Sequence, residues 1–129
     1  YRKLCNYGYN IKLLIAKNSG LEKKLQQLQI PYFAYNKFLV FKTSVQPGLS
    51  SAMLKICKDQ NIQIIHCNIH RETTAARKVA KKLPVKVILT RHIPQPVKSK
   101  YLTNVDGIIA VSSQIKERLW SRGRSRLAR

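Results

Sequence analysis

The sequence predicts an α/β fold in which the strands of a parallel sheet alternate with helices. Three short apolar stretches rich in β-branched residues, at 62–65, 85–89 and 106–111, are predicted to form strands. They lack the regular alternation of apolar and polar residues that a half-exposed antiparallel strand shows, so we expect both faces of each strand to be buried. Residues 73–83 carry apolar side chains at helical spacing, and a helix between two strands is typical of a parallel sheet.

Length and composition favour one domain. The chain has 129 residues, 44% of them apolar, which is enough for one hydrophobic core and too few for two domains of ordinary size. We expect a single layered unit over residues 1–120. Residues 121–129 are rich in arginine and poor in apolar residues, so we expect a basic tail that is mobile or docked on an anionic partner.

The charge balance favours anionic partners. The chain has 25 lysines and arginines against 5 acidic residues, which gives a formal charge of +20 at pH 7. Nucleic acid, anionic lipid headgroups and phosphorylated substrates all qualify. The basic residues are spread from Arg2 to Arg129, whereas a nucleic-acid-binding face concentrates them, so nucleic acid is less favoured. A basic surface that is only solvated is the remaining alternative.

The cysteines and the apolar runs bear on the location of the protein. Cys5, Cys57 and Cys67 are an odd number, and two of them lie in apolar or helical runs, which favours a reduced, cytoplasmic setting. No apolar run approaches the roughly 20 residues that a membrane-spanning helix requires. Any contact with a membrane is therefore expected to be peripheral.

Several elements are predicted before the three main strands. Residues 1–7 resemble the last turn of a helix that Gly8 ends in a left-handed conformation, so the chain is expected to begin inside an element. A strand is predicted at 10–16. Ser19 and Glu22 then have the spacing of a capping box, which predicts the start of a helix. The buried stripe of that helix is expected to comprise Leu21, Leu25 and Leu28.

Two further strands and a helix follow. Pro31 ends the preceding helix, and short strands are predicted at 32–35 and 38–41. A helix with Pro47 in its first turn then runs to Asp59. Its inward-facing side chains are expected to be Leu49, Ala52, Met53, Ile56 and Cys57.

Two short helices flank the last predicted strand. One is expected at 97–102, after a loop that two prolines keep out of helical geometry. The other is expected at 114–120, where Ile115 and Leu119 share one face and are predicted to be buried.

Polar side chains follow each of the three main strands and form the candidate site. Ligands of parallel sheets bind beyond the carboxyl ends of the strands, so we expect these side chains to meet at one edge. Together they can bind a hydroxylated or phosphorylated ligand, with Arg71 and Arg91 suited to hold phosphate through paired hydrogen bonds. His92 lies between a strand and a rigid proline loop, where a role in function is favoured over packing. The candidate residues are Asn68, His70, Arg71, Arg91, His92 and Ser112.

Structural roles remain open for some of these positions. His66 is interpreted as a half-buried histidine at a strand end. Asn68 can cap the helix that follows it, and Ser112 or Ser113 can cap the helix after the last strand.

Several kinds of chemistry have no support in the motifs. The sequence has no G-x-x-x-x-G-K-[ST] phosphate loop, no G-x-G-x-x-G and no H-E-x-x-H. A metal site formed by His66, Cys67 and His70 is disfavoured because further acidic or thiolate ligands are lacking. Only 5 acidic residues are present, so hydrolysis by paired carboxylates is not expected either.

Four stretches match the motifs of a known family in order and in rough spacing. Residues 7–9 precede an apolar strand as in the family's G-H-x-V, and residues 62–66 are similar to its D-I-I-H-x-H. Residues 87–92 are similar to V-x-T-x-H, and residues 106–112 to D-x-I-I-A-V-S. Through these motifs the chain resembles the N-terminal half of a family-4 glycosyltransferase, the retaining, glycogen-synthase-like group with the GT-B architecture. The resemblance implies a Rossmann-like parallel sheet with helices on both faces.

The resemblance implies transfer of a sugar from a nucleotide-sugar donor to an acceptor hydroxyl, with this domain on the acceptor side. His92 matches the family histidine near the reacting sugar, Ser112 matches the serine of A-V-S, and Asn68 stands where the family often has a second histidine. No cofactor is implied beyond the nucleotide sugar as co-substrate, bound mainly by a C-terminal domain expected after Leu119. The family's first strand is expected before Tyr1, so the chain alone is expected to be inactive.

The resemblance also suggests a setting for the reaction. A lipid- or glycan-linked acceptor in cell-envelope or lipopolysaccharide synthesis is expected, with a hexosyltransferase-like enzyme that is cytoplasmic and peripheral on the inner face of the membrane. The basic surface would attract anionic lipid there. The alternative is a basic nucleic-acid-binding module on an α/β scaffold, whose affinity would fall steeply with salt.

Overall fold

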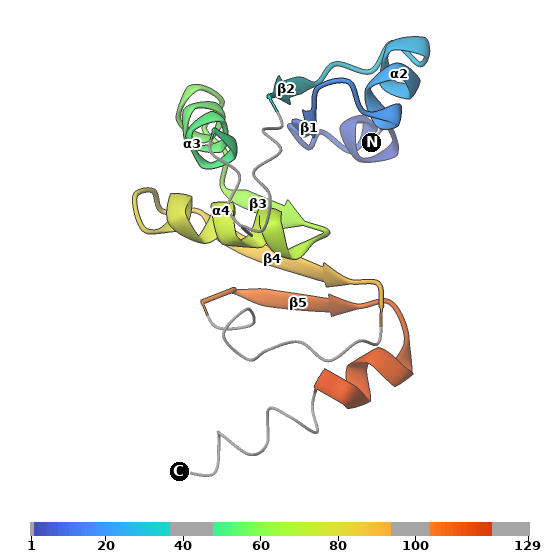
Figure 1. Ribbon diagram of the computed structural model, residues 1–129, viewed down its shortest axis with the longest axis vertical. Helices are drawn as coiled ribbons and strands as arrows, with labels where there is room; N and C mark the ends of the chain where they lie inside the picture. The colour runs from blue at the N-terminus through green and yellow to red at the C-terminus, as the bar shows by residue number, and fades with distance from the viewer. Residues whose placement is uncertain (1, 37–47, 94–103, 120–129) are drawn as a thin grey trace. The chain divides into compact units, whose positions relative to one another are not determined.

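The computed structural model describes residues 2–36, 48–93 and 104–119. The chain divides into two compact units, residues 1–40 and 41–129 (Figure 1). The described strands form a two-stranded sheet in the first unit and a three-stranded sheet in the second, where the sequence had suggested a single layered unit. Every strand pair is parallel, which confirms the predicted α/β class with parallel strands.

The first unit contains a two-stranded sheet and two helices. Its elements are α1 (Arg2–Asn6), β1 (Leu14–Ala16), α2 (Gly20–Gln27) and β2 (Phe33–Tyr35). Gly8 has a φ angle of +82°, the left-handed conformation predicted for the residue after the first helix. The strand predicted at 10–16 is only three residues long, because its ladder with the three-residue β2 runs from Leu14 to Ala16.

The start of α2 follows its capping signal, but its buried face is smaller than predicted. Ser19 is the N-cap residue, and its Oγ accepts a hydrogen bond from the Glu22 N–H at 3.2 Å. Leu25 is 6% exposed, whereas Leu21 and Leu28 are 53% and 45% exposed, so the predicted leucine stripe is wrong at two positions. α2 packs against β1, and two strands of three residues are too small to cover three leucines.

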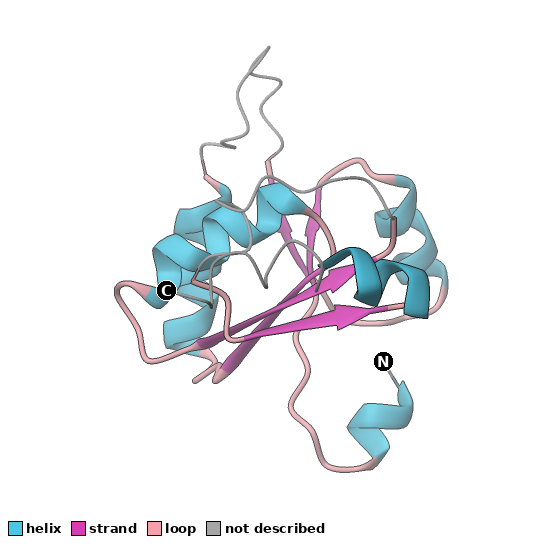
Figure 2. Ribbon diagram, turned by 90° about the horizontal axis from the view of Figure 1, so that it is seen from below, coloured by secondary structure: helices cyan, strands magenta, loops and turns pink. Residues whose placement is uncertain are grey.

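The second unit contains three parallel strands in the order β3-β4-β5. Its elements are α3 (Leu49–Asp59), β3 (Ile64–Cys67), α4 (His70–Ala80), β4 (Lys86–Arg91), β5 (Gly107–Ala110) and a helix at residues 113–119. The three arrows labelled β3, β4 and β5 point the same way in Figure 1, and the longer arrows of Figure 2 lie side by side. α4 packs against β3, β4 and α3. In Figure 1 the helix at 113–119 lies beyond β5, on the side away from α3 and α4.

The core of the second unit lies between α4 and one face of the sheet. Ile65, Val87 and Leu89 are buried on the strands, and Val79 is buried on α4. The expectation that both faces of every strand are buried is wrong, since Ile64 on β3 is 59% exposed. Among the described residues, α4 covers the face that bears Val87 and Leu89, and the alternation of side chains leaves the opposite face more open.

Two element boundaries differ from the predictions for reasons that involve other segments. β4 continues through Thr90 to Arg91, because its end pairs with β5. α4 begins at His70, where residues 73–83 were predicted to be helical, because the Glu72 carboxylate accepts the N–H groups of two preceding residues. Several predictions lie outside the described residues: Pro47, the strand at 38–41, the helix at 97–102 and the tail at 121–129.

Asp106 ties the start of β5 to the start of β4. Its Oδ2 accepts a hydrogen bond from the Val87 N–H at 2.8 Å, and its Oδ1 lies 2.9 Å from the Lys86 ammonium. The Val87 N–H, followed by Lys86, holds the pKa of Asp106 below the usual aspartate value. Because the folded pKa is the lower one, the carboxylate stabilises the fold above the usual aspartate pKa, and this contribution is lost as the pH falls through the folded pKa.

The Asp106→Asn variant is therefore expected to be less stable than the parent chain at neutral pH and close to it in acid. The asparagine keeps an oxygen that can accept from the Val87 N–H, so the variant reports on the charge. Urea denaturation followed by circular dichroism, at neutral pH and at a pH below the lowered pKa of Asp106 in the folded state, measures the difference. A stability difference that does not change with pH would contradict this role for the charge.

Candidate functional site

The carboxyl ends of three strands meet at one edge of the second unit's sheet. Cys67 pairs with Leu89, and Arg91 pairs with Ala110, so β3, β4 and β5 all end near one another (Figure 1). The predicted meeting of these strand ends is confirmed at the level of the backbone. We call this edge the carboxyl edge, and parallel sheets bind their ligands there.

A hydrogen bond joins two candidate residues across the carboxyl edge. The Nε2 atom of His92 lies 3.2 Å from the Oδ1 atom of Asn68, and both side chains are exposed. An amide oxygen accepts, so Nε2 carries the proton that is donated. In the neutral ring the Nδ1 atom of His92 is then an acceptor, and the Asn68 amide retains two N–H donors. The pair therefore presents both an acceptor and donors to a ligand.

A second pair of polar side chains comes from the residues two positions earlier in each segment, which lie on β3 and β4. The Nε2 atom of His66 lies 2.6 Å from the Oγ1 atom of Thr90. Side chains two residues apart in a strand share a face, so His66 on β3 and Asn68 just after it share a face with Thr90 on β4 and His92 just after it. We call these four residues the polar ladder.

Sequence reasoning missed two members of the polar ladder. His66 was interpreted as a half-buried histidine just after its strand, but β3 runs from residue 64 to 67 and the side chain is exposed. Thr90 was placed just beyond its strand and lies within β4. The spacing of two between His66 and Asn68, and between Thr90 and His92, is the signal that could have found the ladder.

Arg91 occupies the opposite face of β4 from the polar ladder. Its side chain is only 7% exposed, and its Nη2 donates a hydrogen bond to the carbonyl oxygen of Ile93 at 3.2 Å. Burial lowers the pKa of this guanidinium from its usual value. The structure therefore does not bring Arg91 together with His92 on one face.

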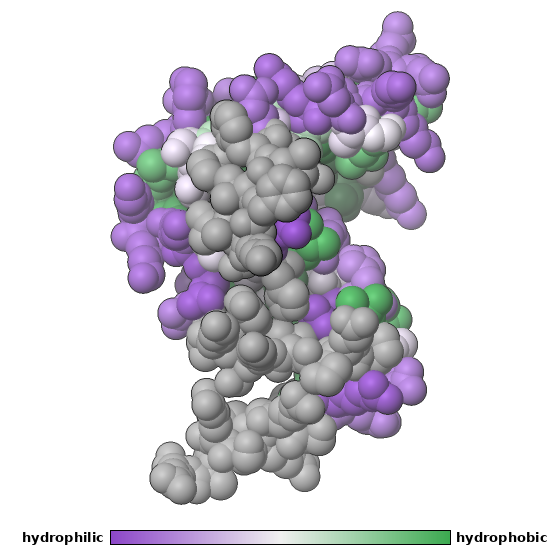
Figure 3. All heavy atoms as spheres, viewed as in Figure 1, coloured by the Kyte–Doolittle hydropathy of each residue, from purple (hydrophilic) through white to green (hydrophobic). Residues whose placement is uncertain are grey.

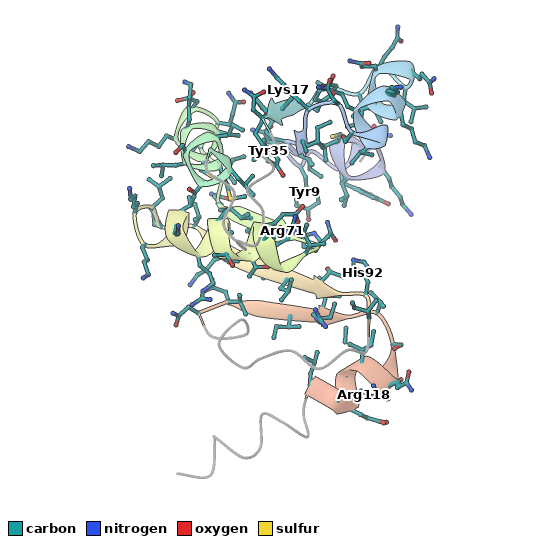
Figure 4. The ribbon with its side chains drawn as sticks, viewed as in Figure 1. Tyr9, Lys17, Tyr35, Arg71, His92 and Arg118 are labelled. Carbon is teal, nitrogen blue, oxygen red and sulfur yellow. The ribbon has the colours of Figure 1, made fainter. Side chains whose placement is uncertain are left out.

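His70 and Arg71 begin α4 beside the end of β3. The Glu72 carboxylate accepts the N–H groups of Asn68 at 2.9 Å and of Ile69 at 3.3 Å, which holds this corner of the chain in place. Arg71 is exposed in the first turn of α4 (Figure 4). It is thus a cation at the carboxyl edge whose side chain faces solvent.

Ser112 has a structural partner. Its Oγ accepts a hydrogen bond from the Ile115 N–H at 3.3 Å, and its carbonyl oxygen accepts from the Lys116 N–H at 3.0 Å. These contacts make Ser112 the cap of the helix at 113–119, the structural alternative that the sequence left open. Ile115 is 4% exposed, as predicted for the inner face of that helix.

Two substitutions separate the capping role of Ser112 from a role in substrate binding. Ser112→Ala should destabilise the second unit by about 1 kcal/mol, and Ser112→Asp should retain most of the stability because aspartate is also a good cap. Urea denaturation measures both. If both variants unfold at the same urea concentration as the parent chain, the Ser112 hydroxyl does not cap the helix. The result would then favour the role in substrate binding.

The buried cysteines are unsuited to nucleophilic or metal chemistry. Cys67 is 1% exposed, and burial, with the nearby Glu72 carboxylate, raises the pKa of its thiol to about 12. Burial also raises the pKa of Cys57. These thiols stay protonated at neutral pH. Within residues 2–36, 48–93 and 104–119, no group of three histidine, cysteine or acidic side chains is arranged to hold a metal ion.

The parallel sheet and the polar residues at its carboxyl edge define an α/β ligand-binding domain. The family model described as Glycosyltransferase Family 4 matches residues 2–128, and the chain belongs to this family. The match confirms the resemblance drawn from the four motifs and the Rossmann-like class of the fold. Searches among curated proteins and among solved structures returned no significant match.

Proposed function

We propose that the chain forms the acceptor-side domain of a glycosyltransferase that moves a sugar from a nucleotide-sugar donor to an acceptor hydroxyl. The observation that carries the proposal is the Asn68–His92 pair at the carboxyl edge, in a chain that belongs to Glycosyltransferase Family 4. Sugars are recognised by side chains that both donate and accept hydrogen bonds, and this pair offers both.

In this proposal His92 is the catalytic residue that contacts the reacting sugar. Its Nε2–H is held by Asn68, which fixes the ring and leaves Nδ1 to accept a hydrogen bond from a sugar hydroxyl. The free amide N–H groups of Asn68 can donate to a second sugar oxygen. Arg71, exposed at the same edge, is suited to a phosphate of the substrate.

Substrate binding is assigned more weakly to the remaining candidates. Ser112 caps a helix, and Arg91 is buried with a backbone partner, so both have contacts that explain them without a ligand. His70 stays a prediction from the sequence. We therefore centre the proposed site on Asn68, His92 and Arg71.

The donor is proposed to bind mainly to a second domain. The polar ladder and Arg71 supply few groups for a nucleotide diphosphate, and the sequence has none of the glycine-rich phosphate loops. In the GT-B architecture that the motifs resemble, the C-terminal domain holds the nucleotide. We accordingly expect the chain alone to show no sugar transfer.

The acceptor is proposed to be lipid- or glycan-linked, in a hexosyltransferase-like reaction of cell-envelope synthesis on the cytoplasmic side of a membrane. The net charge of +20 supports contact with anionic lipid headgroups. Figure 3, which is coloured by hydropathy, shows that hydrophilic residues cover much of the described surface in that view. None of the helices in the described ranges is both long and apolar enough to cross a bilayer.

The experiment is a transfer assay with the glycosyltransferase that contains this chain. A panel of nucleotide sugars is offered with lipid-linked and glycan acceptors, and acceptor mass and nucleoside diphosphate release are measured. We expect an acceptor heavier by one hexose residue, and no transfer by the 129-residue chain alone. If no donor is consumed and the chain instead binds nucleic acid with an affinity that drops by several decades as salt rises, the nucleic-acid-binding alternative replaces the proposal.

A further inference from the structure

Each of the three strand ends at the carboxyl edge carries an exposed aliphatic side chain. Ile69 follows Asn68 after β3, Ile93 follows His92 after β4, and Val111 directly follows β5. The three aliphatic residues are 53%, 51% and 52% exposed, in that order. Figure 3, which has the same view as Figure 1, shows hydrophobic residues at the surface where β4 and β5 end. We call Ile69, Ile93 and Val111 the apolar rim.

Hydrogen bonds hold the three segments of the apolar rim beside one another. The Val111 N–H donates to the carbonyl oxygen of Arg91 at 3.3 Å, and the Arg91 guanidinium donates to the carbonyl oxygen of Ile93 at 3.2 Å. The Asn68–His92 hydrogen bond joins the segment after β3 to the segment after β4. Neighbouring strands are about 4.8 Å apart, so the rim extends over roughly 10 Å of the edge.

The strand register places the apolar rim directly beside the proposed site. Thr90 pairs with Ile109, so the residues two positions later, His92 and Val111, are neighbours on the same face of the sheet. Ile109 is itself 49% exposed. The polar ladder is therefore bordered, on its β5 side, by two half-exposed aliphatic side chains.

The position of the apolar rim indicates a ligand that carries hydrocarbon. Exposed aliphatic side chains that occur singly need no explanation in a protein surface. The three rim residues come from separate segments, however, and gather at the edge where parallel sheets bind their ligands. Apolar surface bordered by polar side chains is typical of ligand-binding and interaction sites, and the polar side chains here are Asn68, His92 and Ser112.

We propose that the apolar rim binds the hydrocarbon part of an amphiphilic acceptor whose sugar hydroxyl meets the Asn68–His92 pair. This inference rests on the proposed function and deepens it, because it selects a lipid-linked acceptor over a glycan-linked one. Ile93 directly follows His92 and Val111 lies beside it, so the rim is the surface that the rest of a bound acceptor meets first. A glycan would place hydroxyl groups against side chains that cannot hydrogen-bond them, whereas hydrocarbon loses nothing there.

The first test titrates the full 129-residue chain with octyl glucoside, below the concentration at which it forms micelles, and with methyl glucoside. The two probes present the same sugar and differ only in their hydrocarbon. The amide signals in ¹⁵N NMR spectra give both the affinity and the location. We expect octyl glucoside to bind about tenfold more tightly than methyl glucoside or better, and to shift the signals of Ile69, Ile93 and Val111.

A rim variant, I93T/V111T, removes hydrocarbon from the rim and keeps the β-branched shape of both side chains. Ile69 is left in place because it is the N-cap residue of α4. The matched control is L21T/I64T, since Leu21 and Ile64 are 53% and 59% exposed and lie away from the carboxyl edge. We expect the rim variant to bind octyl glucoside about tenfold more weakly, and the control to stay within about twofold of the parent chain.

A second variant separates loss of hydrocarbon from loss of folding. Val111→Leu enlarges the apolar surface of an exposed position, so it should retain octyl glucoside binding, and thermal unfolding checks all the variants. Equal affinity for the two glucosides, equal losses in the rim variant and the control, or NMR shifts that avoid the rim would overturn the proposal. So would self-association of the parent chain that the rim variant abolishes, because the rim would then be covered by a second copy.

A transfer assay with the proposed glycosyltransferase that includes the chain separates this inference from the proposed function. Methyl and octyl glycosides of several hexoses serve as acceptors. We expect a KM about tenfold lower for the octyl acceptor, and the rim variant should remove that difference with little change in kcat. Equal KM values for the two acceptors would overturn the inference and leave sugar transfer standing. If no sugar is transferred while octyl glucoside still binds at the rim, the rim binds an amphiphile and it is the proposed function that fails.

Discussion

Alanine in place of His92 is expected to lower sugar transfer by about a hundredfold or more while leaving the fold intact. His92 follows β4 and is exposed, so its removal leaves no buried cavity. The variant loses the Nε2–H donated to Asn68 and the Nδ1 acceptor proposed to face the reacting sugar. An interaction that strengthens in the transition state should appear mainly in kcat rather than in KM.

The measurement is kcat and KM for the proposed glycosyltransferase that includes the chain, with thermal unfolding as a check on folding. His92→Gln, which keeps a hydrogen-bonding side chain, should recover part of the loss. Lys55→Gln serves as a control because Lys55 is exposed on α3 and pairs only with Asp59 among the contacts described for it. A His92→Ala enzyme with an unchanged kcat would remove His92 from the proposed chemistry.

Truncation of Leu89 is expected to be the most destabilising single change in the second unit. Leu89 is 1% exposed at the centre of β4, where it pairs with Cys67 on β3 and Ile108 on β5. Leu89→Ala removes buried methyl groups and leaves a cavity that the paired strands cannot close, so we expect a loss of about 2–5 kcal/mol in the free energy of unfolding.

Urea denaturation, combined with hydrogen exchange of the β4 amides, measures the effect of Leu89→Ala. The matched control is Ile109→Ala on the neighbouring β5, because Ile109 is 49% exposed and should cost less than about 1 kcal/mol. Equal losses for the two variants would mean that Ile109 is as well packed as Leu89, and that the sheet is covered on both faces.

The sequence located the three strands of the second unit because that signal is local. Apolar β-branched runs at 62–65, 85–89 and 106–111 correspond to β3, β4 and β5, with ends shifted by two residues or fewer. The helix between the first two runs implied a parallel crossover, and parallel strands bring their carboxyl ends to one edge. The prediction that residues after β3 and β4 meet there is therefore realised in the Asn68–His92 hydrogen bond.

The sequence could not predict how many side chains of each element are buried, because burial depends on the neighbouring elements. Leu21, Leu25 and Leu28 have the same chemistry and helical spacing, yet only Leu25 is buried, since the size of the sheet beneath α2 decides how many leucines it covers. The start of α4 likewise depends on the Glu72 carboxylate reaching back to preceding N–H groups.

By itself, the sequence determined the parallel α/β class, the family, the order of the strands along the chain and the edge at which polar residues gather. Only the tertiary structure decided which face each polar side chain occupies. A strand places successive side chains on opposite faces, and β4 is extended by its ladder with β5, so Thr90 and His92 share the polar ladder while Arg91 is buried behind them. The alternation of these residues is visible in the sequence, but pairing with a segment far along the chain extends β4 through Thr90 and Arg91, and packing against α4 decides which of the two faces is covered.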